Sequence, residues 1–399
     1  IFIIQCNYFH FWFNIPNPLG LTMKAVVVGY SRSPFTPAKR GELAKTRPDD
    51  IAATVVNGLL KKTGIDPSLI EDLIVGTAFP EAEQGFNMAR MVTFLSDLPE
   101  TVPGVTINRF CGSSMQAIHD AVGRISMGAG DAFIAGGVES MSRIPMTGFN
   151  PMPNPKLSLD FPEAFTSMGV TAENLAQMYS IDREEQENFA IESQQRASKF
   201  RESGAFKDEI VVIETTTGVV DSDGCLRPKT DSAALSNLSP AFDINGTVTA
   251  GTSSPLTDGA AFVLVCSERF AKENGLTPLA RILSTAVTAC SPEIMGIGPV
   301  EATRKALKRA GISLEEIGII ELNEAFAAQS LAVISELKMD KSKVNIEGGA
   351  IALGHPLGAS GARITGKAAQ LMSNNDEKYA LATMCIGGGQ GIATILERI

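Results

Sequence analysis

Two residues of this chain combine a reactive side chain with a setting that favours chemistry. Cys111 follows the apolar stretch 104–110 and precedes Gly-Ser-Ser at the start of a predicted helix. Backbone N–H groups at a helix N-terminus stabilise an anion, so we expect a lowered thiol pKa and a nucleophilic thiolate. His355 lies in the run GGAIALGHPLGASGAR, whose glycines allow a ligand to approach the backbone. The alternatives are an inert buried thiol and a structural histidine.

A second thiol and an amide extend this set. Cys385 opens the run CIGGGQG after the apolar stretch 379–384, and the run does not match the GxGxxG spacing of a dinucleotide site. A thiol beside exposed backbone N–H groups instead suits an oxyanion hole with an acid–base group, although a glycine turn with an idle thiol is the alternative. Asn323 ends the predicted strand 317–322, where it either caps the strand or belongs to the site. His119 is interpreted as a packing or interface residue.

Alternating helices and strands must position these groups. Hydrophobic periodicity predicts helices over 49–63 and 112–127 and near 171–200, and strands at 24–30, 73–76, 104–110, 133–137, 262–265, 317–322 and 379–384. This order is typical of an α/β layered fold.

The second half of the sequence repeats the first. GLLKKTGIDPSLIEDLIVGTAF (58–79) and ALKRAGISLEEIGIIELNEAF (306–326) share a helix end, a Gly-Ile stop and an apolar strand. A looser match relates 105–118 to 344–364. We therefore predict an internal duplication in which each copy contributes one active-site segment. The predicted boundaries are an N-terminal half over 23–142 and 247–272, an inserted loop domain over 143–246, and a C-terminal half over 273–399.

Composition limits the class of protein. The 399 residues are 44% hydrophobic and 20% charged, as in globular proteins, and the net charge of −10 argues against nucleic acid as the main partner. Six cysteines show no CxxC or zinc spacing, so we expect free thiols in the cytoplasm and no metal. No apolar run is long enough for a membrane helix. Residues 1–22 lack the basic start of a signal peptide and are interpreted as a non-native extension, with a membrane-touching or interaction tail as the alternative.

Three motifs give the chain a family resemblance. They are NRFCGSSMQAIHDA (108–121), NEAFA (323–327) with GGAIALGHPLGASGAR (348–363), and CIGGGQG (385–391). Through them residues 23–399 resemble the thiolase family. The resemblance implies the thiolase fold, with two duplicated halves in αβαβα layers and an inserted loop domain. It also implies coenzyme A thioesters as substrates and no tightly bound cofactor.

The resemblance assigns a role to each motif residue. Cys111 matches the nucleophile, His355 its activating base and Cys385 the second acid–base group. Asn323 matches the residue that holds a catalytic water. The backbone N–H groups of Cys111 and Gly387 are expected to form an oxyanion hole.

Coenzyme A contacts follow less directly from the motifs. Ser254 lies in a match to the family's VTAGxxS stretch, and Arg227 lies in the loop domain, where the match is weak. The segment 146–168 is rich in Met and Phe and ends at Ser167 and Met168. It is either loop-domain packing or an acyl channel.

Within the family the favoured activity is degradative cleavage of 3-ketoacyl-CoA in fatty acid beta-oxidation. The alternative is an acetyl-CoA acetyltransferase, which usually has His where Ser167 stands. Three other functions fit the sequence less well. A ketoacyl-synthase-like condensing enzyme needs a second histidine where Asn323 stands, and a Cys–His–Asn hydrolase would leave Cys385 without a role. A non-catalytic acyl-CoA-binding protein would not need all four catalytic positions to be intact. The resemblance also implies a homodimer or homotetramer and a possible complex with a hydratase–dehydrogenase subunit.

Overall fold

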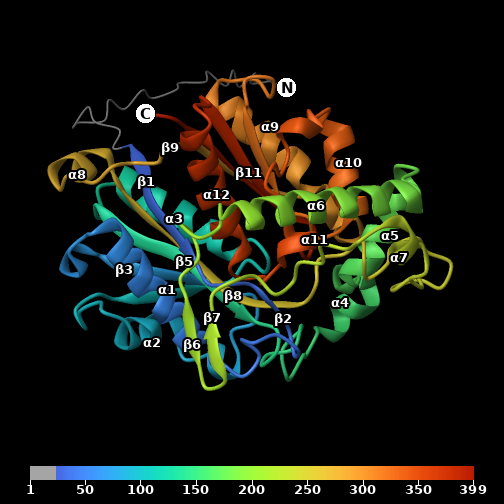
Figure 1. Ribbon diagram of the computed structural model, residues 1–399, viewed down its shortest axis with the longest axis horizontal. Helices are drawn as coiled ribbons and strands as arrows, with labels where there is room; N and C mark the ends of the chain where they lie inside the picture. The colour runs from blue at the N-terminus through green and yellow to red at the C-terminus, as the bar shows by residue number, and fades with distance from the viewer. Residues whose placement is uncertain (1–23) are drawn as a thin grey trace, which may run out of the picture.

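The computed structural model describes residues 24–399, in which all strands except a separate two-stranded hairpin form one ten-stranded mixed sheet (Figure 1). The strand order is β10-β11-β12-β9-β1-β8-β5-β3-β4, and the short β2 (Thr36–Pro37) pairs with β8. The first half contributes β1 (Ala25–Arg32), β3 (Asp72–Gly76), β4 (Gly104–Ile107), β5 (Ala132–Ser140) and β8 (Thr257–Ser267). The second half contributes β9 (Ala280–Ala289), β10 (Ile319–Leu322), β11 (Tyr379–Ile386) and β12 (Gln390–Glu397).

Helices cover both faces of this sheet. The helices are α1 (Pro48–Thr63), α2 (Met88–Leu95), α3 (Ser113–Ser126), α8 (Glu268–Glu273), α9 (Gly298–Ala310), α10 (Ala327–Leu337), α11 (Ala350–Leu353) and α12 (Ser360–Asn374). Helices α1 and α2 pack on the first half of the sheet and α9 on the second. Helix α12 contacts α3 as well as strands of both halves. Helices α1 and α2, the first half of the sheet, the central helices α3 and α12, the second half of the sheet and α9 thus follow one another, so the two halves of the sheet form the two strand layers of the predicted αβαβα order.

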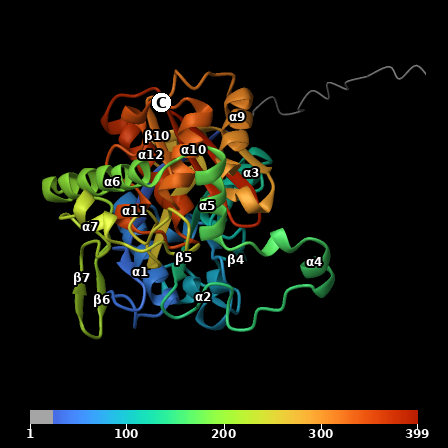
Figure 2. The same ribbon diagram turned by 90° about the vertical axis from the view of Figure 1, so that its right-hand side faces the viewer.

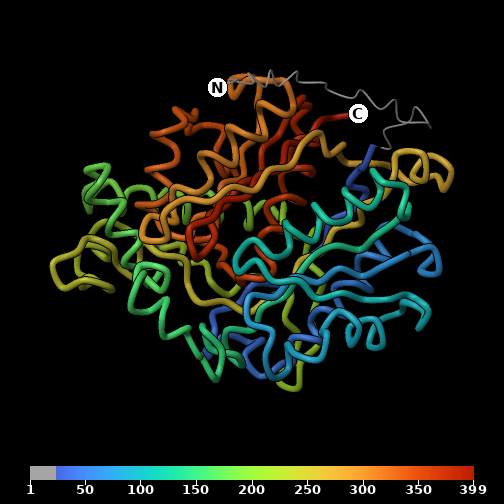
Figure 3. Tube along the Cα trace, turned by 180° about the vertical axis from the view of Figure 1, so that it is seen from behind, coloured from blue at the N-terminus to red at the C-terminus, as the bar shows by residue number. Residues whose placement is uncertain are grey.

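The two halves meet through the central helices and one short strand contact. β1 pairs with β9 only at Val26 and Val27. The main apolar core includes Ile118 of α3, Phe133 of β5 and Ile364 of α12, each at most 1% exposed. Figure 3 shows the two halves, blue to cyan and orange to red, lying side by side. The central core therefore joins elements of both halves.

The predicted duplication is visible in the topology. Helices α1 and α9 both end at a left-handed glycine, Gly64 (φ 68°) and Gly311 (φ 70°), because only glycine enters that region without a Cβ clash. Each glycine leads to a strand, β3 or β10, that has a parallel neighbour. β3 pairs with β4, and Ile320 of β10 forms a parallel bridge to Val344.

One predicted helix is wrong. The segment near 171–200 forms two helices, α5 (Met168–Met178) and α6 (Arg183–Ser203). Between them Ser180 is left-handed (φ 53°), and Asp182 starts α6 through a capping box with Glu185. The cap satisfies N–H groups at the start of α6, so the chain gains a new helix start instead of continuing the first helix.

The rest of the segment 143–246 is irregular. It carries α4 (Pro155–Asp160), the hairpin β6 (Ile213–Thr215) and β7 (Gly218–Val220), and α7 (Ser232–Ser236). Figure 2 shows α4 on an arm that extends away from the sheet. Within residues 24–399 no helix has the length and apolar character needed to cross a membrane. The predicted non-native extension, residues 1–22, lies outside the described residues.

Candidate active site

A strained turn carries Cys111 between β4 and α3. Phe110 is left-handed (φ 43°), a conformation that costs a bulky residue about 1–3 kcal/mol and is concentrated at functional sites. The turn is held by Asn108 Oδ1, which accepts from Phe110 N at 2.8 Å, and by Ser113 Oγ, which donates to Phe110 O at 2.6 Å. Helix α3 begins at Ser113, two residues after the thiol. The helix thus begins one residue after the predicted start at Gly112, which is the N-cap.

The Cys111 turn touches the end of β11. A Cβ on Gly112 would lie 2.5 Å from Ile386 Cδ1, so glycine is needed for this close approach. The backbone N–H groups of Gly387 and of Cys111 itself lie near enough to the Cys111 sulfur to lower its pKa. Cys385 is 2% exposed, and its thiol is close enough to Cys111 for a charge there to raise its pKa. Both predicted thiols and the predicted N–H pair thus come together.

The predicted fall in the pKa of Cys111 is wrong for the free chain. Burial raises the pKa of this thiol to about 11, and the N–H of Gly387 lowers it by a smaller amount. The carboxylate of Glu139 contributes to this rise. The free energy that the thiolate loses when it is removed from water exceeds the stabilisation that the two N–H groups provide. Cys111 is therefore a neutral thiol at rest and needs a base.

Hydrogen bonds fix the orientation and tautomer of His355. Its Nδ1 lies 2.5 Å from Ser360 Oγ, while the Ser360 hydroxyl donates to Pro356 O at 3.0 Å. Because that proton is used, Ser360 Oγ accepts from His355 Nδ1–H, and Nε2 keeps its lone pair. Burial, with a smaller contribution from the charge of Arg363, lowers the pKa of His355 to about 3. The ring is therefore a neutral base at physiological pH.

Asn323 lies beside the free nitrogen of that ring. Its Nδ2 is 3.4 Å from His355 Nε2, and the residue is fully buried at the end of β10. Its Oδ1 has no hydrogen-bond partner among the described residues. A buried acceptor of this kind can take a hydrogen bond from a water molecule or from a ligand group. His355 and Asn323 thus form one pair, and Cys111, Cys385 and Gly387 form a second group. The two approach each other through Leu357, which lies in one apolar cluster with Cys111, and through Asn323 N, which donates to Thr383 O at 3.1 Å, two residues before Cys385.

The two predicted coenzyme A contacts have different surroundings. Ser254 is half-buried, and its N–H donates to Ala325 O at 3.0 Å, directly beside the Asn323 loop. Arg227 is exposed on the inserted segment and is anchored through its N–H to Gln194 Oε1 at 2.8 Å. His119 lies half-buried 2.9 Å from Thr394 Oγ1, a contact that fits the predicted packing role.

The Met- and Phe-rich side chains before Ser167 are not buried, as the interpretation of loop-domain packing predicted they would be. Phe149 is 60% exposed, Met152 82% and Phe165 49%. Only Met168 reaches the site, with its sulfur 3.4 Å from the position of a Cβ on Gly387 and its side chain against the cluster that includes Cys385.

Sequence reasoning missed two supporting residues. Ser360 accepts from the His355 ring, and Glu324 lies buried directly after Asn323. A signal for Ser360 was available, because it is a polar residue inside the glycine-rich run that contains the histidine. Nothing in the sequence marks the partners of Glu324, which come from distant segments.

Comparisons with known proteins identify the family of the chain. The description "Thiolase, N-terminal domain" matches residues 25–269, and "Thiolase, C-terminal domain" matches residues 276–398. A 3-ketoacyl-CoA thiolase of Bacillus subtilis is 48% identical, and the match covers 94% of this chain and 99% of the relative. One of Shigella boydii is 47% identical, and the match covers 94% of this chain and 100% of the relative. The crystal structure of human mitochondrial 3-ketoacyl-CoA thiolase is 39% identical, with a TM-score of 0.88 over 94% of this chain and 99% of that one. A second structure of that human protein, in complex with CoA, gives a TM-score of 0.87. The fold is the thiolase fold, and the chain belongs to the thiolase family.

Proposed function

We propose that this chain is a 3-ketoacyl-CoA thiolase, an acyltransferase that uses coenzyme A to cleave 3-ketoacyl-CoA into acetyl-CoA and a shortened acyl-CoA. One observation carries the proposal: two thiols, Cys111 and Cys385, lie together beside the N–H of Gly387. The relatives from Bacillus subtilis and Shigella boydii carry this activity in their names, which supports it further.

The first half-reaction forms an acyl-enzyme. His355 Nε2 takes the Cys111 proton as the sulfur attacks the C3 ketone, and the bond between C2 and C3 breaks. The electrons pass to an enolate of acetyl-CoA, whose oxygen is stabilised by His355 Nε2–H and by a water held on Asn323 Oδ1. Cys385 then gives its proton to C2 and is left as a thiolate. Burial keeps the pKa of Cys385 raised, so this thiol is protonated at the start, as a general acid must be.

The second half-reaction releases the shortened chain. The Cys385 thiolate takes the proton of incoming coenzyme A, whose sulfur attacks the acyl group on Cys111. The N–H groups of Cys111 and Gly387 stabilise the oxygen of the tetrahedral intermediate, and each such donor is worth about 3 kcal/mol of barrier. Cys111 leaves as a thiolate and recovers its proton from His355. No tightly bound cofactor is required.

Coenzyme A binding is assigned to Ser254 and Arg227. Ser254 lies beside the Asn323 loop, and the exposed guanidinium of Arg227 is suited to a phosphate. We retain residues 143–246 as an inserted loop domain between a first half at 23–142 with 247–272 and a second half at 273–399. The human relative crystallised in complex with CoA supports this ligand.

The rival activities leave features without a role. A Cys–His–Asn hydrolase would not need Cys385, and a condensing enzyme with two histidines has only His355 here. A non-catalytic acyl-CoA-binding protein would not need the orienting bond from His355 to Ser360. Within the family, the exposed apolar arm that leads to Met168 favours longer acyl chains over acetoacetyl-CoA, and so favours fatty acid degradation.

An oligomer is also proposed, as a homodimer or homotetramer in the cytoplasm with a possible hydratase–dehydrogenase partner. Strand β4 ends the sheet, and near this edge Phe86 is 91% exposed, Phe94 55% and Phe110 40%. An open strand edge with exposed aromatic side chains favours association. Light scattering after size exclusion gives the oligomer, and a monomer at micromolar concentration would contradict it.

The activity is tested with purified chain and 3-ketoacyl-CoA substrates of increasing length. Acetyl-CoA and an acyl-CoA shorter by one acetyl unit should form only when coenzyme A is added, whereas a hydrolase would release a free acid without it. Each buried methylene contributes up to about 0.8 kcal/mol, so kcat/KM for 3-ketohexanoyl-CoA and longer substrates should exceed that for acetoacetyl-CoA. Strict preference for acetoacetyl-CoA would instead indicate an acetyl-CoA acetyltransferase.

A further inference from the structure

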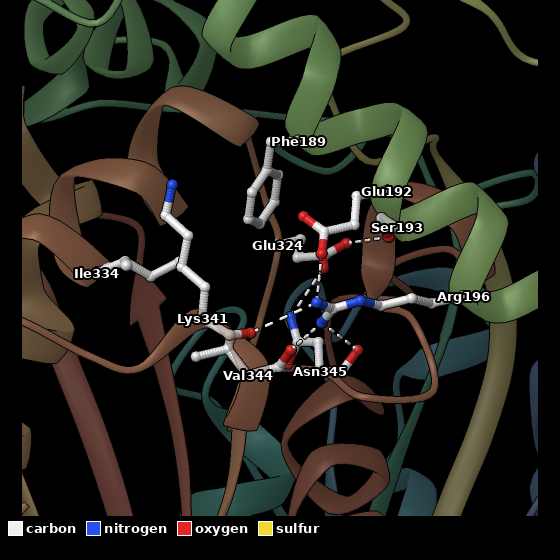
Figure 4. A pocket seen from close by; sticks show the side chains of 9 residues that line it. All are labelled: Phe189, Glu192, Ser193, Arg196, Glu324, Ile334, Lys341, Val344 and Asn345. Atoms are coloured by element: carbon white, nitrogen blue, oxygen red, sulfur yellow. Dashed lines mark hydrogen bonds and ion pairs between the residues drawn. The ribbon is translucent and has the colours of Figure 1, made fainter.

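The carboxylate next to Asn323 is a buried junction between three segments. Glu324 is 2% exposed, and it accepts from Ser193 Oγ at 2.6 Å, from Asn345 Nδ2 at 2.8 Å and from Ile351 N at 3.1 Å. Figure 4 shows its carboxylate between Ser193 of α6 and Asn345. All three donors are uncharged, so this carboxylate is held by directed hydrogen bonds and not by an ion pair.

The Asn345 contact fixes the strand that carries Asn323. Asn345 is left-handed (φ 47°) and buried, and its side chain pairs with both backbone groups of Leu322: Oδ1 accepts from Leu322 N at 2.9 Å, and Nδ2 donates to Leu322 O at 2.8 Å. The same Nδ2 donates to Glu324 Oε1. The residues on either side of Asn323 are thus bound to one amide.

The other two contacts fix the helix that leads to His355. Glu324 Oε2 accepts from Ile351 N in the first turn of α11, and Ser193 Oγ, which donates to Glu324, accepts from Gly349 N at 3.1 Å. A Cβ on Gly349 would lie 2.1 Å from Glu324 Cδ, so the carboxylate rests directly on this helix start. Helix α11 ends at Leu353, two residues before His355.

From this geometry we infer that Glu324 is a positioning residue, which sets the separation of Asn323 and His355 by binding the Asn323 loop and the start of α11 to one carboxylate. The inference rests on the proposed function, in which this pair stabilises the enolate oxygen. Donors aimed at a developing charge act over a narrow range of positions, and a shift of about 1 Å can cost about 100-fold in rate.

Two variants disturb the two sides of the junction. In Glu324→Gln the amide oxygen takes the place of Oε2, where two donors meet, so the NH₂ group faces Asn345 Nδ2 and that bond is lost. Ser193→Ala removes a donor on the α11 side and leaves the carboxylate. Glu192→Gln is the matched control, because Glu192 lies on the same pocket wall, its side chain is 49% exposed, and it pairs with Arg196.

Two partial reactions separate positioning from general damage. Exchange of the acetyl-CoA methyl protons in D₂O requires the enolate and hence the correctly spaced pair Asn323 and His355. Transfer of an acyl group to labelled coenzyme A requires Cys111, its N–H groups and His355 as a base, but neither an enolate nor Asn323. For Glu324→Gln we expect kcat and proton exchange to fall about 10-fold or more, KM to stay within about twofold, and acyl transfer to stay within about threefold. Ser193→Ala should show a smaller loss of the same kind, and Glu192→Gln none.

Equal losses in the two partial reactions, or a kcat of Glu324→Gln within twofold of wild type, would overturn the inference. If Glu324→Gln does not fold, Ser193→Ala decides the question by the same comparison of the loss in proton exchange with the loss in acyl transfer. A crystal structure of either folded variant gives a reading that is independent of activity. The distance from Asn323 Nδ2 to His355 Nε2, 3.4 Å in the wild type, should change, and an unchanged distance would refute the positioning role even if the wild type proved not to cleave 3-ketoacyl-CoA.

Discussion

Replacement of Ser360 by alanine tests how the tautomer of His355 is selected. Ser360 Oγ accepts from His355 Nδ1–H because its own proton is used by Pro356 O. Alanine removes this acceptor and leaves the buried Nδ1–H without a partner. The ring can then carry its proton on Nε2, where it cannot take the proton of Cys111.

The magnitude follows from one hydrogen bond in a buried site. An unsatisfied buried donor costs about 1–3 kcal/mol, and the ring escapes that cost by moving the proton to Nε2. If the reactive tautomer loses about 1.4 kcal/mol relative to the other, the ratio of the two tautomers changes about tenfold, and kcat/KM falls with the population of the reactive tautomer, by up to about tenfold. The free energy of unfolding should decrease by about 1–2 kcal/mol.

Kinetics and NMR measure the two consequences separately. Steady-state thiolysis gives kcat/KM, and ¹⁵N chemical shifts of the imidazole report the tautomer. The chain has only three histidines, so the His355 signals are readily assigned. Ser284→Ala is the control, because Ser284 Oγ also donates to a backbone carbonyl, Ala306 O at 2.7 Å, but contacts no histidine in the structure.

The reasoning would be refuted in two ways. A kcat/KM of Ser360→Ala within twofold of wild type, with the Nδ1–H tautomer retained, would show that another group selects the tautomer. An equal loss in Ser284→Ala would show that the effect comes from lost stability and not from the ring.

Three further predictions follow from the site and from the ends of the chain. Cys111→Ala should abolish thiolysis, and because burial raises the pKa of Cys111 to about 11, alkylation of the wild type by iodoacetamide should accelerate steeply between pH 7 and pH 9.5; a flat profile would contradict the raised pKa. Burial lowers the pKa values of His355 and His119 to about 3, so as the pH falls below about 6.5 these histidines take up protons in the unfolded chain before they do in the folded chain. The free energy of unfolding, measured with urea, should therefore be lower at pH 5 than at pH 7 by up to about 2 kcal/mol per histidine. Equal stability at the two pH values would contradict this prediction. A chain that begins at Met23 should match the full chain in activity and thermal stability, and a large loss of either would show that the preceding residues belong to the fold.

Local sequence patterns determined much of the fold. The periodicity of 49–63 and the Gly64 stop predicted α1 correctly, because helix propensity and a left-handed C-terminal glycine act within a few residues. The repeated Gly-Ile stop before an apolar strand predicted the duplication for the same reason. The prediction of one helix near 171–200 is wrong because the capping box at Asp182, which is also a local signal, starts a second helix there.

The site divides in the same way. The glycine-rich turns and the helix start after Cys111 predicted the candidate reactive residues by type and spacing. Their electrostatics could not be predicted, because the pKa of Cys111 depends on how completely other segments remove its sulfur from water. Glu324 was equally hidden, since it meets Ser193, a residue 131 positions away. Local residue types and spacing were enough to predict which groups can react. Their protonation states and their separation depend on tertiary structure. Burial, and hydrogen bonds between distant segments, exist only after the two halves have packed together.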